Sequence, residues 1–189
     1  MINTDYFCRS GCVGNAGAPQ GEFVRDGTKY QWPGNHKRAA LRFDSSNTAS
    51  ITTYGPYVGN DGSNISGYRQ IVSGSPITLW QGSVSCRPLG EEDPSNHCGT
   101  TIYRTAACIS SNGKTLWLLA TATATTWNNL ANFMKNQLGC YSGMEFDGGT
   151  TTAGSTSMVY KGSSKVTGGA VGTGLLVRWR SGCPCLATP

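Results

Sequence analysis

Hydrophobic and polar residues alternate along this chain over short stretches that end in turn residues, which is the pattern of β-strands. In the first half of the chain, Gly, Pro and Asn interrupt the sequence often. Between these interruptions the pattern predicts strands at residues 39–43, 50–54 and 75–80. Residues 82–100 are polar and are predicted to form a loop.

The centre of the chain carries the clearest local signals. Two β-rich runs, residues 101–110 and 114–124, are separated by Ser-Asn-Gly at 111–113. Asn-Gly between two such runs is the strongest short hairpin signal, so we expect a hairpin here.

A helix is predicted next, at about residues 126–138. Leu130, Phe133, Met134 and Leu138 recur at the spacing of one helical face, and Gly139 follows as a stop signal. Thr125 or Thr126 is expected to cap the first turn.

Further strands are predicted at residues 141–146, 157–161 and 174–179. No internal repeat or linker marks a boundary, and 189 residues suffice for one core, so residues 1–189 are predicted to form a single domain. The expected fold class is α+β and β-rich, with mixed sheets and one main helix. The opening residues, 1–7, are expected to be a strand already under way, with further sequence upstream.

Composition supports a chain of strands and turns, with 26 Gly and only 13% charged residues. The formal charge of +5 comes from scattered Lys and Arg without a basic run or helix, which argues against nucleic acid as a partner. A modest positive charge favours anionic ligands such as sugar phosphates. No apolar stretch is long enough to span a membrane.

The eight cysteines show no paired spacing of a structural zinc site, so disulfides and an oxidising compartment are expected. Three pairs are predicted from their positions, and the partners of Cys183 and Cys185 stay open. The predicted pairs are Cys8 with Cys12, Cys86 with Cys98, and Cys108 with Cys140. An export signal is expected to have been removed or to lie upstream. Asn64 opens an Asn-X-Ser glycosylation sequon.

Two carboxylates near the end of the strand at 141–146 are the first candidate for chemistry. Glu145 and Asp147 point to the same face of an extended strand and are followed by Gly148, Gly149 and a turn rich in hydroxyl groups. Such a pair can divide acid and base roles in glycosyl transfer. The alternative is a plain Asx turn at Asp147. No cofactor is expected, although a divalent cation near Asp147 stays an alternative.

Arg104 is the second candidate, because it enters an otherwise small and apolar strand. Its planar fork of donors suits a phosphate or a carboxylate, so a ligand clamp and a structural salt bridge both fit, with Asp147 as the candidate partner for the salt bridge. The third candidate is the segment at residues 3–7, where alternation places Asn3 and Asp5 on one face.

These segments occur in an order that resembles the phosphodiester glycosidase family. The quoted motifs are NTDYF at 3–7, YRTA at 103–106, EFDGG at 145–149 and GSTSM at 154–158, with the hairpin and helix between the second and third. The resemblance implies hydrolysis of a sugar phosphodiester, such as removal of N-acetylglucosamine that covers a mannose 6-phosphate. It also implies that the chain lacks the strands with which domains of this family begin.

The resemblance implies a pocket lined by residues of all these motifs. Arg104 would hold the phosphate, Asp147 would be the acid/base or metal-facing carboxylate, and Asn3 would orient the sugar. The remaining positions carried over, or belonging to the same turn, are Asp5, Thr105, Gly148, Gly149, Ser155 and Thr156.

Two other functions stay open at this point. The first is a catalytically inactive relative that assembles by strand exchange, with another chain donating a strand beside residues 3–7. The second is a carbohydrate-binding module with Trp32, Trp80 or Trp127 as a stacking platform. We expect Trp80 to lie in the core and Trp127 at the helix start.

Overall fold

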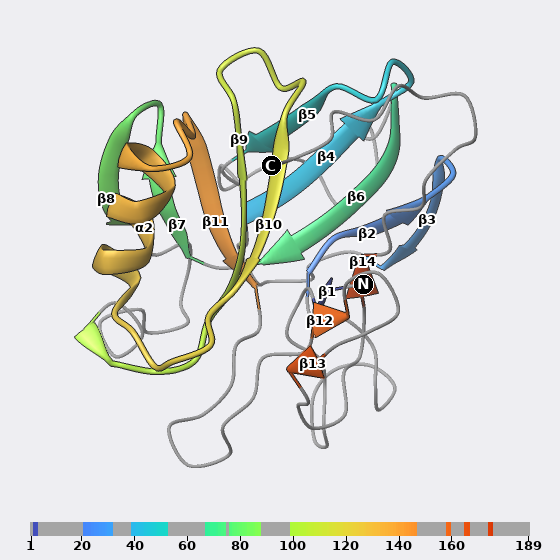
Figure 1. The fold of residues 1–189 in the computed structure, drawn as a ribbon. Helices are drawn as coiled ribbons and strands as arrows, with labels where there is room; N and C mark the ends of the chain where they lie inside the picture. Colours follow the sequence, from blue (N-terminus) through green and yellow to red (C-terminus); the bar gives the residue numbers. More distant parts are fainter. Residues whose placement is uncertain are drawn as a thin grey trace.

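The computed structural model describes residues 2–3, 21–31, 39–52, 67–74, 76–87, 99–146, 158–159, 165–166 and 174–175. Figure 1 shows the strands of these segments in three sheets. Two sheets have five strands each, in the orders β3-β2-β6-β4-β5 and β10-β9-β11-β7-β8. A small four-stranded sheet has the order β13-β12-β1-β14.

The first five-stranded sheet is made by the first half of the chain. Its strands are β2 (Phe23–Arg25), β3 (Thr28–Gln31), β4 (Ala39–Asp44), β5 (Ala49–Thr52) and β6 (Tyr68–Gly74). The sheet is antiparallel at every described pair, and β6 lies between β2 and β4. The β4–β5 turn is closed by Asp44, whose carboxylate accepts hydrogen bonds from the backbone N–H groups of Ser46 and Thr48.

The second five-stranded sheet carries the predicted hairpin. Its strands are β7 (Ile77–Trp80), β8 (Ser83–Arg87), β9 (Thr105–Ile109), β10 (Leu116–Ala120) and β11 (Ser142–Phe146). β9 and β10 pair in continuous antiparallel register from Ile109–Leu116 to Thr105–Ala120. β11 lies between β9 and β7, which makes it the central strand of this sheet.

Gly113 in the β9–β10 turn joins the two sheets. Its backbone has a φ of +67°, and its carbonyl accepts a hydrogen bond from the N–H of Ala49 at 2.8 Å. A Cβ at this position would collide with the Ala49 carbonyl oxygen, so the close approach requires glycine.

The two large sheets pack face to face, and a helix covers the outer face of the second. The core between the sheets is formed by Ala39, Leu41, Ala49, Ile51, Val72, Ile77, Ala107, Ile109, Met144 and Phe146. A second core lies between β7, β9 and the helix α2, formed by Leu79, Ala106, Cys108, Leu130, Ala131, Met134 and Cys140. Figure 1 shows α2 on one side of β11 and the strands β4, β5 and β6 on the other.

The helix α2 (Trp127–Asn136) forms where the apolar spacing predicts it. Thr126 is the N-cap, because its hydroxyl accepts a hydrogen bond from the N–H of Asn129 at 3.2 Å. At the other end Gly139 has a φ of +67° and Cys140 donates its N–H to the Met134 carbonyl, which closes the last turn.

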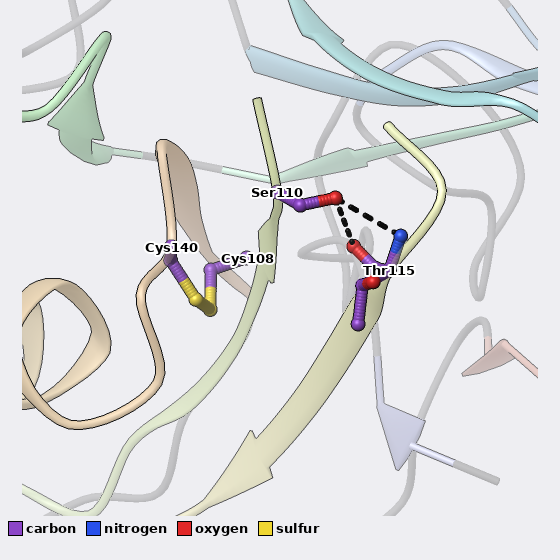
Figure 2. Close-up of a disulfide and its surroundings, with 4 residues drawn as sticks. All are labelled: Cys108, Ser110, Thr115 and Cys140. Atoms are coloured by element: carbon purple, nitrogen blue, oxygen red, sulfur yellow. Dashed lines mark hydrogen bonds between the residues drawn. A yellow bond between two sulfur atoms is a disulfide. The ribbon is translucent and has the colours of Figure 1, made fainter. Parts of the chain in front are cut away.

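A disulfide joins Cys108 in β9 to Cys140 just before β11, as predicted (Figure 2). It closes a loop with a sequence separation of 32 that contains the β9–β10 turn, β10 and α2. Figure 2 also shows Ser110 and Thr115 hydrogen bonded across the β9–β10 turn, where the Thr115 N–H donates to the Ser110 Oγ at 3.0 Å. Cys86 is disulfide-bonded too, to a cysteine outside the described residues.

The small sheet joins the two ends of the sequence. Its strands are β1 (Ile2–Asn3), β12 (Met158–Val159), β13 (Lys165–Val166) and β14 (Gly174–Leu175). Ile2 pairs with Met158 on one side and with Leu175 on the other. At Ile2, therefore, both edges of β1 are occupied by this same chain. The strand donation predicted beside residues 3–7 stays a prediction, because residues 4–7 lie outside the described residues.

The β-rich α+β class, the hairpin, the helix and the Cys108–Cys140 disulfide are confirmed. The expectation of mixed sheets is wrong for the described strands, since every described pair is antiparallel and neighbours such as β9 and β10 need only a short turn. The predicted loop at 82–100 contains β8, which pairs with β7. Phe133, predicted for the buried helix face, is 46% exposed, and Ala131 packs in its place. Four further strands, β2, β3, β6 and β13, have no counterpart among the predicted strands.

Candidate active site

The register of the second sheet brings two of the sequence motifs side by side. Phe146 at the end of β11 is paired with Thr105 at the start of β9, and Glu145 is paired with Ala106. The YRTA segment and the EFDGG segment therefore meet at one end of the sheet. The small sheet brings the NTDYF and GSTSM motifs together, because β1, which ends at Asn3, lies beside β12, which begins at Met158.

Arg104 ties three parts of the chain together at this end of the sheet. Its side chain is fully buried, and its Nη1 forms a salt bridge with Oε1 of Glu145. Its Nε donates to the Thr125 carbonyl at 2.9 Å, and its Nη2 donates to the Thr100 carbonyl at 2.5 Å. Sequence analysis left Arg104 either a ligand clamp or a structural salt bridge. The described contacts are those of a structural salt bridge, with Glu145 as the partner.

The backbone around Arg104 is equally well fixed. The Arg104 N–H donates to the Thr121 Oγ1, and the Thr121 N–H donates back to the Arg104 carbonyl, both at 2.9 Å. Ile102 and Thr125 exchange two backbone hydrogen bonds, at 3.2 and 2.8 Å. The segment that leads into β9 and the segment that leads into α2 are thus held against each other just where Arg104 reaches Glu145.

Glu145 is a buried carboxylate with an unusual proton affinity. Its side chain is 3% exposed. Burial raises the pKa of Glu145 from 4.5 to about 7, while the charge and the hydrogen bond of Arg104 act in the opposite direction. Within the part of the chain that the structure describes, Oε2 of Glu145 has no hydrogen-bond partner. A carboxyl group of this kind changes its charge near neutral pH.

The candidate residues of the two strands do not all share a face. Alternation along β9 places Thr105 on the side of Ala107 and Ile109, which belong to the core between the sheets. Arg104 lies on the opposite side, with Ala106 and Cys108 of the core under α2. The structure therefore brings Arg104 and Glu145 together and places Thr105, which is also buried, on the other face.

Most other predicted site residues lie outside the described residues. Asn3 is placed only by its backbone, which pairs with Gly174. Nothing is described for Asp5, Asp147, Gly148, Gly149, Ser155, Thr156, the sequon at Asn64, or the cysteines at 8, 12, 98, 183 and 185. Their predicted roles stay predictions.

The tryptophans weighed as stacking platforms pack against the cores. Trp80 contacts the core between the sheets, and Trp127, the first residue of α2, contacts the core under the helix. Trp32 lies outside the described residues.

Other features of the described residues lie away from this site or add nothing to it. A cavity of about 330 Å³ opens at the β4–β5 hairpin and contains no predicted site residue; its lining is Asp44, Thr48, Ala49, Ser50, Gly67 and Tyr68. In the segments that the structure describes, no three His, Cys, Asp or Glu side chains are grouped to hold a metal ion. No helix found in those segments has the length and apolar character needed to cross a membrane.

Sequence reasoning missed Thr100 and Thr125, whose carbonyl oxygens hold Arg104. Both contacts use backbone atoms, so the residue types carry no signal for them. Only the presence of a buried arginine, with its five donors, indicates that such carbonyls must exist.

The fold and the site together define a class: a β-rich α+β domain of two face-to-face antiparallel sheets, with a helix on one outer face and a buried Arg–Glu pair at the strand ends. The family model for phosphodiester glycosidases matches residues 2–178. That is nearly the whole chain, and the chain therefore belongs to the phosphodiester glycosidase family.

Two solved structures have the same fold. The chain is similar to the zebrafish N-acetylglucosamine-1-phosphodiester alpha-N-acetylglucosaminidase catalytic domain auto-inhibited by its pro-peptide, with a TM-score of 0.60 and 16% identity over 82% of this chain and 52% of that one. It is also similar to a hypothetical protein from Synechocystis, with a TM-score of 0.54 and 13% identity over 83% of this chain and 46% of that one. The chain thus spans about half the length of these proteins. No curated protein matches.

Proposed function

We propose that this protein is an extracellular hydrolase of sugar phosphodiesters. The observation that carries the proposal is the family match over residues 2–178, together with a register that joins its motifs in pairs at strand ends. In such a reaction water attacks the anomeric carbon, the bond from that carbon to the phosphate oxygen breaks, and a phosphomonoester leaves. The products are a free sugar and a phosphate monoester.

The proposed substrate is a sugar linked through its anomeric carbon to a phosphodiester, for which N-acetylglucosamine is the first choice. The name of the zebrafish neighbour supports this choice. Asp147 is the proposed acid/base, because it directly follows the buried strand β11 at the strand end where the motifs meet. Asn3 and Asp5 are proposed to orient the sugar, and the turn after Asp147 to supply backbone N–H groups to the phosphate.

The proposed location outside the cell rests on the cysteines. The Cys108–Cys140 disulfide and the disulfide of Cys86 support an oxidising compartment. A secreted protein can also use the sequon at Asn64.

The reaction is tested with two probes: UDP-N-acetylglucosamine, and methyl mannoside 6-phosphate covered by N-acetylglucosamine. Each is incubated in water enriched in ¹⁸O, and the products are analysed by mass spectrometry. A glycosidase places the label in the released sugar. Label in the phosphate would mean that a phosphorus–oxygen bond breaks and would overturn the proposed reaction.

Two variants make the test specific. Asp147→Asn should lower kcat at least about a hundredfold, as expected when a general acid or base is removed. Asp26→Asn is the matched control: Asp26 is an exposed residue of the β2–β3 turn with a φ of +50°, a conformation that asparagine tolerates well. Its turnover should equal that of the wild type. Equal turnover in Asp147→Asn would contradict the proposed role of Asp147.

A further inference from the structure

We propose that Glu145 is a positioning residue, which acts on the reaction by fixing Arg104 at the end of β9 rather than by touching the substrate. This inference rests on the proposed function for its kinetic part. Its structural part concerns the Arg104 side chain and is testable without any substrate.

The contacts of Arg104 are the first reason. Nε, Nη1 and Nη2 each donate to a different segment: the loop before α2, β11 and the segment before β9. Two of the three acceptors are backbone carbonyls, which carry no net charge, and Glu145 supplies the only carboxylate among the described partners. Removing that carboxylate removes the charge-assisted hydrogen bond that Glu145 accepts from Nη1 of Arg104.

The position of the pair is the second reason. Arg104 immediately precedes Thr105, and Glu145 immediately precedes Phe146, whose partner in the sheet is Thr105. The pair therefore sets the orientation of β9 and β11 at the end of the sheet where the YRTA and EFDGG motifs meet. A displacement of about 1 Å at a reacting group costs up to about a hundredfold in rate, so an anchor at this point affects turnover.

Burial is the main cause of the raised pKa of Glu145, and Arg104 is the charged group that the described structure places against it. Of the described elements packed around it, β7 and the first turn of α2 carry no titratable side chain, and the segment before β9 adds only Tyr103 beside Arg104. Protonation of Glu145, with a pKa of about 7, therefore weakens the anchor as the pH falls.

The kinetic test compares Glu145→Gln with the wild type at pH 5 and pH 8.5, using UDP-N-acetylglucosamine. Glutamine has the shape of the protonated carboxyl group, so the two proteins should have equal kcat at pH 5. At pH 8.5 the variant should lose about tenfold in kcat with KM within about twofold, because a positioning residue acts on the oriented complex. Equal kcat at pH 8.5 would overturn the proposal.

A second measurement needs no activity. In ¹⁵N-labelled protein, rotation of the Arg104 guanidinium group is followed by NMR, and Arg104→Lys identifies the signals by their absence. At pH 8.5 rotation should be about tenfold faster in Glu145→Gln than in the wild type, since a charge-assisted hydrogen bond is roughly twice as strong as a neutral one. Equal rotation would also overturn the proposal. If the wild type hydrolyses neither probe, the proposed function fails, and rotation alone decides the positioning role.

The matched control is a second buried pair, Glu22 with Arg42. It lies in the first sheet, with Arg42 Nη2 at 3.2 Å from Oε2 of Glu22, and both side chains are buried. Glu22→Gln should leave the pH profile of kcat and the rotation of Arg104 unchanged. Changes as large as those of Glu145→Gln would mean that any buried pair has this effect, and would overturn the specific role. Glu145→Asp, which keeps the charge but shortens the reach, replaces Glu145→Gln if that variant does not fold.

Arg104→Lys separates positioning from direct binding of phosphate. A lysine cannot reproduce three planar contacts, so kcat should fall about tenfold or more while KM changes little. A large rise in KM with unchanged kcat would mean that Arg104 holds the substrate itself, and would contradict the inference.

Discussion

Replacing Glu145 with glutamine should change how the stability of this protein depends on pH. The pKa of Glu145 is about 7 in the folded protein against an ordinary value of 4.5. Below pH 4.5 the carboxyl group is protonated in both states and contributes nothing to the dependence. Between 4.5 and about 7 the unfolded chain loses this proton while the folded protein keeps it, so the free energy of unfolding falls as the pH rises.

The size of the effect follows from the width of that window. The two pKa values differ by about 2.5 (about 7 minus 4.5), which corresponds to a loss on the order of 3 kcal/mol between the two ends of the window. Above pH 7 the contribution stays constant. Glutamine does not titrate, so Glu145→Gln lacks this loss. Its free energy of unfolding should therefore rise relative to that of the wild type as the pH rises.

Urea unfolding of both proteins, followed by far-ultraviolet circular dichroism from pH 4 to pH 8.5, measures this difference. The free energy of unfolding of Glu145→Gln minus that of the wild type should rise by on the order of 3 kcal/mol across the range. All other titrating groups cancel in the subtraction. A difference that stays level would refute the raised pKa, and one that falls with pH would mean that the Arg104 charge outweighs burial. Together with the kinetic test, the expected outcome is a variant that is more stable and less active at high pH.

Two further predictions concern the framework around the site. Cys108→Ala combined with Cys140→Ala should lower the free energy of unfolding by about 3 to 4 kcal/mol, because the loop of sequence separation 32 is no longer closed in the unfolded chain. Urea unfolding without reductant measures this loss of stability. An unchanged unfolding midpoint would contradict the prediction. Gly113→Ala should cost more than Gly82→Ala, since both glycines have positive φ but only Gly113 lies against Ala49. Backbone strain alone should lower the free energy of unfolding by about 1 to 2 kcal/mol in Gly82→Ala, and Gly113→Ala should lose about twice that. Thermal unfolding measures both losses. Equal losses in the two variants would show that the contact with Ala49 is unimportant.

The sequence by itself determined the local elements in the centre of this protein. The hairpin at Asn112-Gly113 and the helix beginning after Thr126 depend on contacts between near neighbours, which the residue types encode directly. Cys108 and Cys140 were predictable as a pair because one lies in an apolar strand and the other just before a second one. The motifs and their order were sufficient to indicate the family.

Sequence periodicity was less informative at the edges of elements and on the helix surface. β8 lies in a polar stretch, and it is a strand because β7 offers it an edge to pair with. Phe133 fits the apolar spacing but is exposed, and the helix residues that pack into the core under α2 are Leu130, Ala131 and Met134.

Only the tertiary structure decided the partner of Arg104. A buried arginine needs a negative partner, and from the sequence the candidates were Asp147 and an external phosphate, whereas the partner that the structure describes is Glu145. The antiparallel register of β9 and β11 places Glu145 opposite Ala106, on the face to which Arg104 also points, and the turn before α2 brings the Thr125 carbonyl to the same guanidinium group. Register and the packing of segments far apart in the sequence depend on the whole fold, which is why residue types alone could not determine this contact.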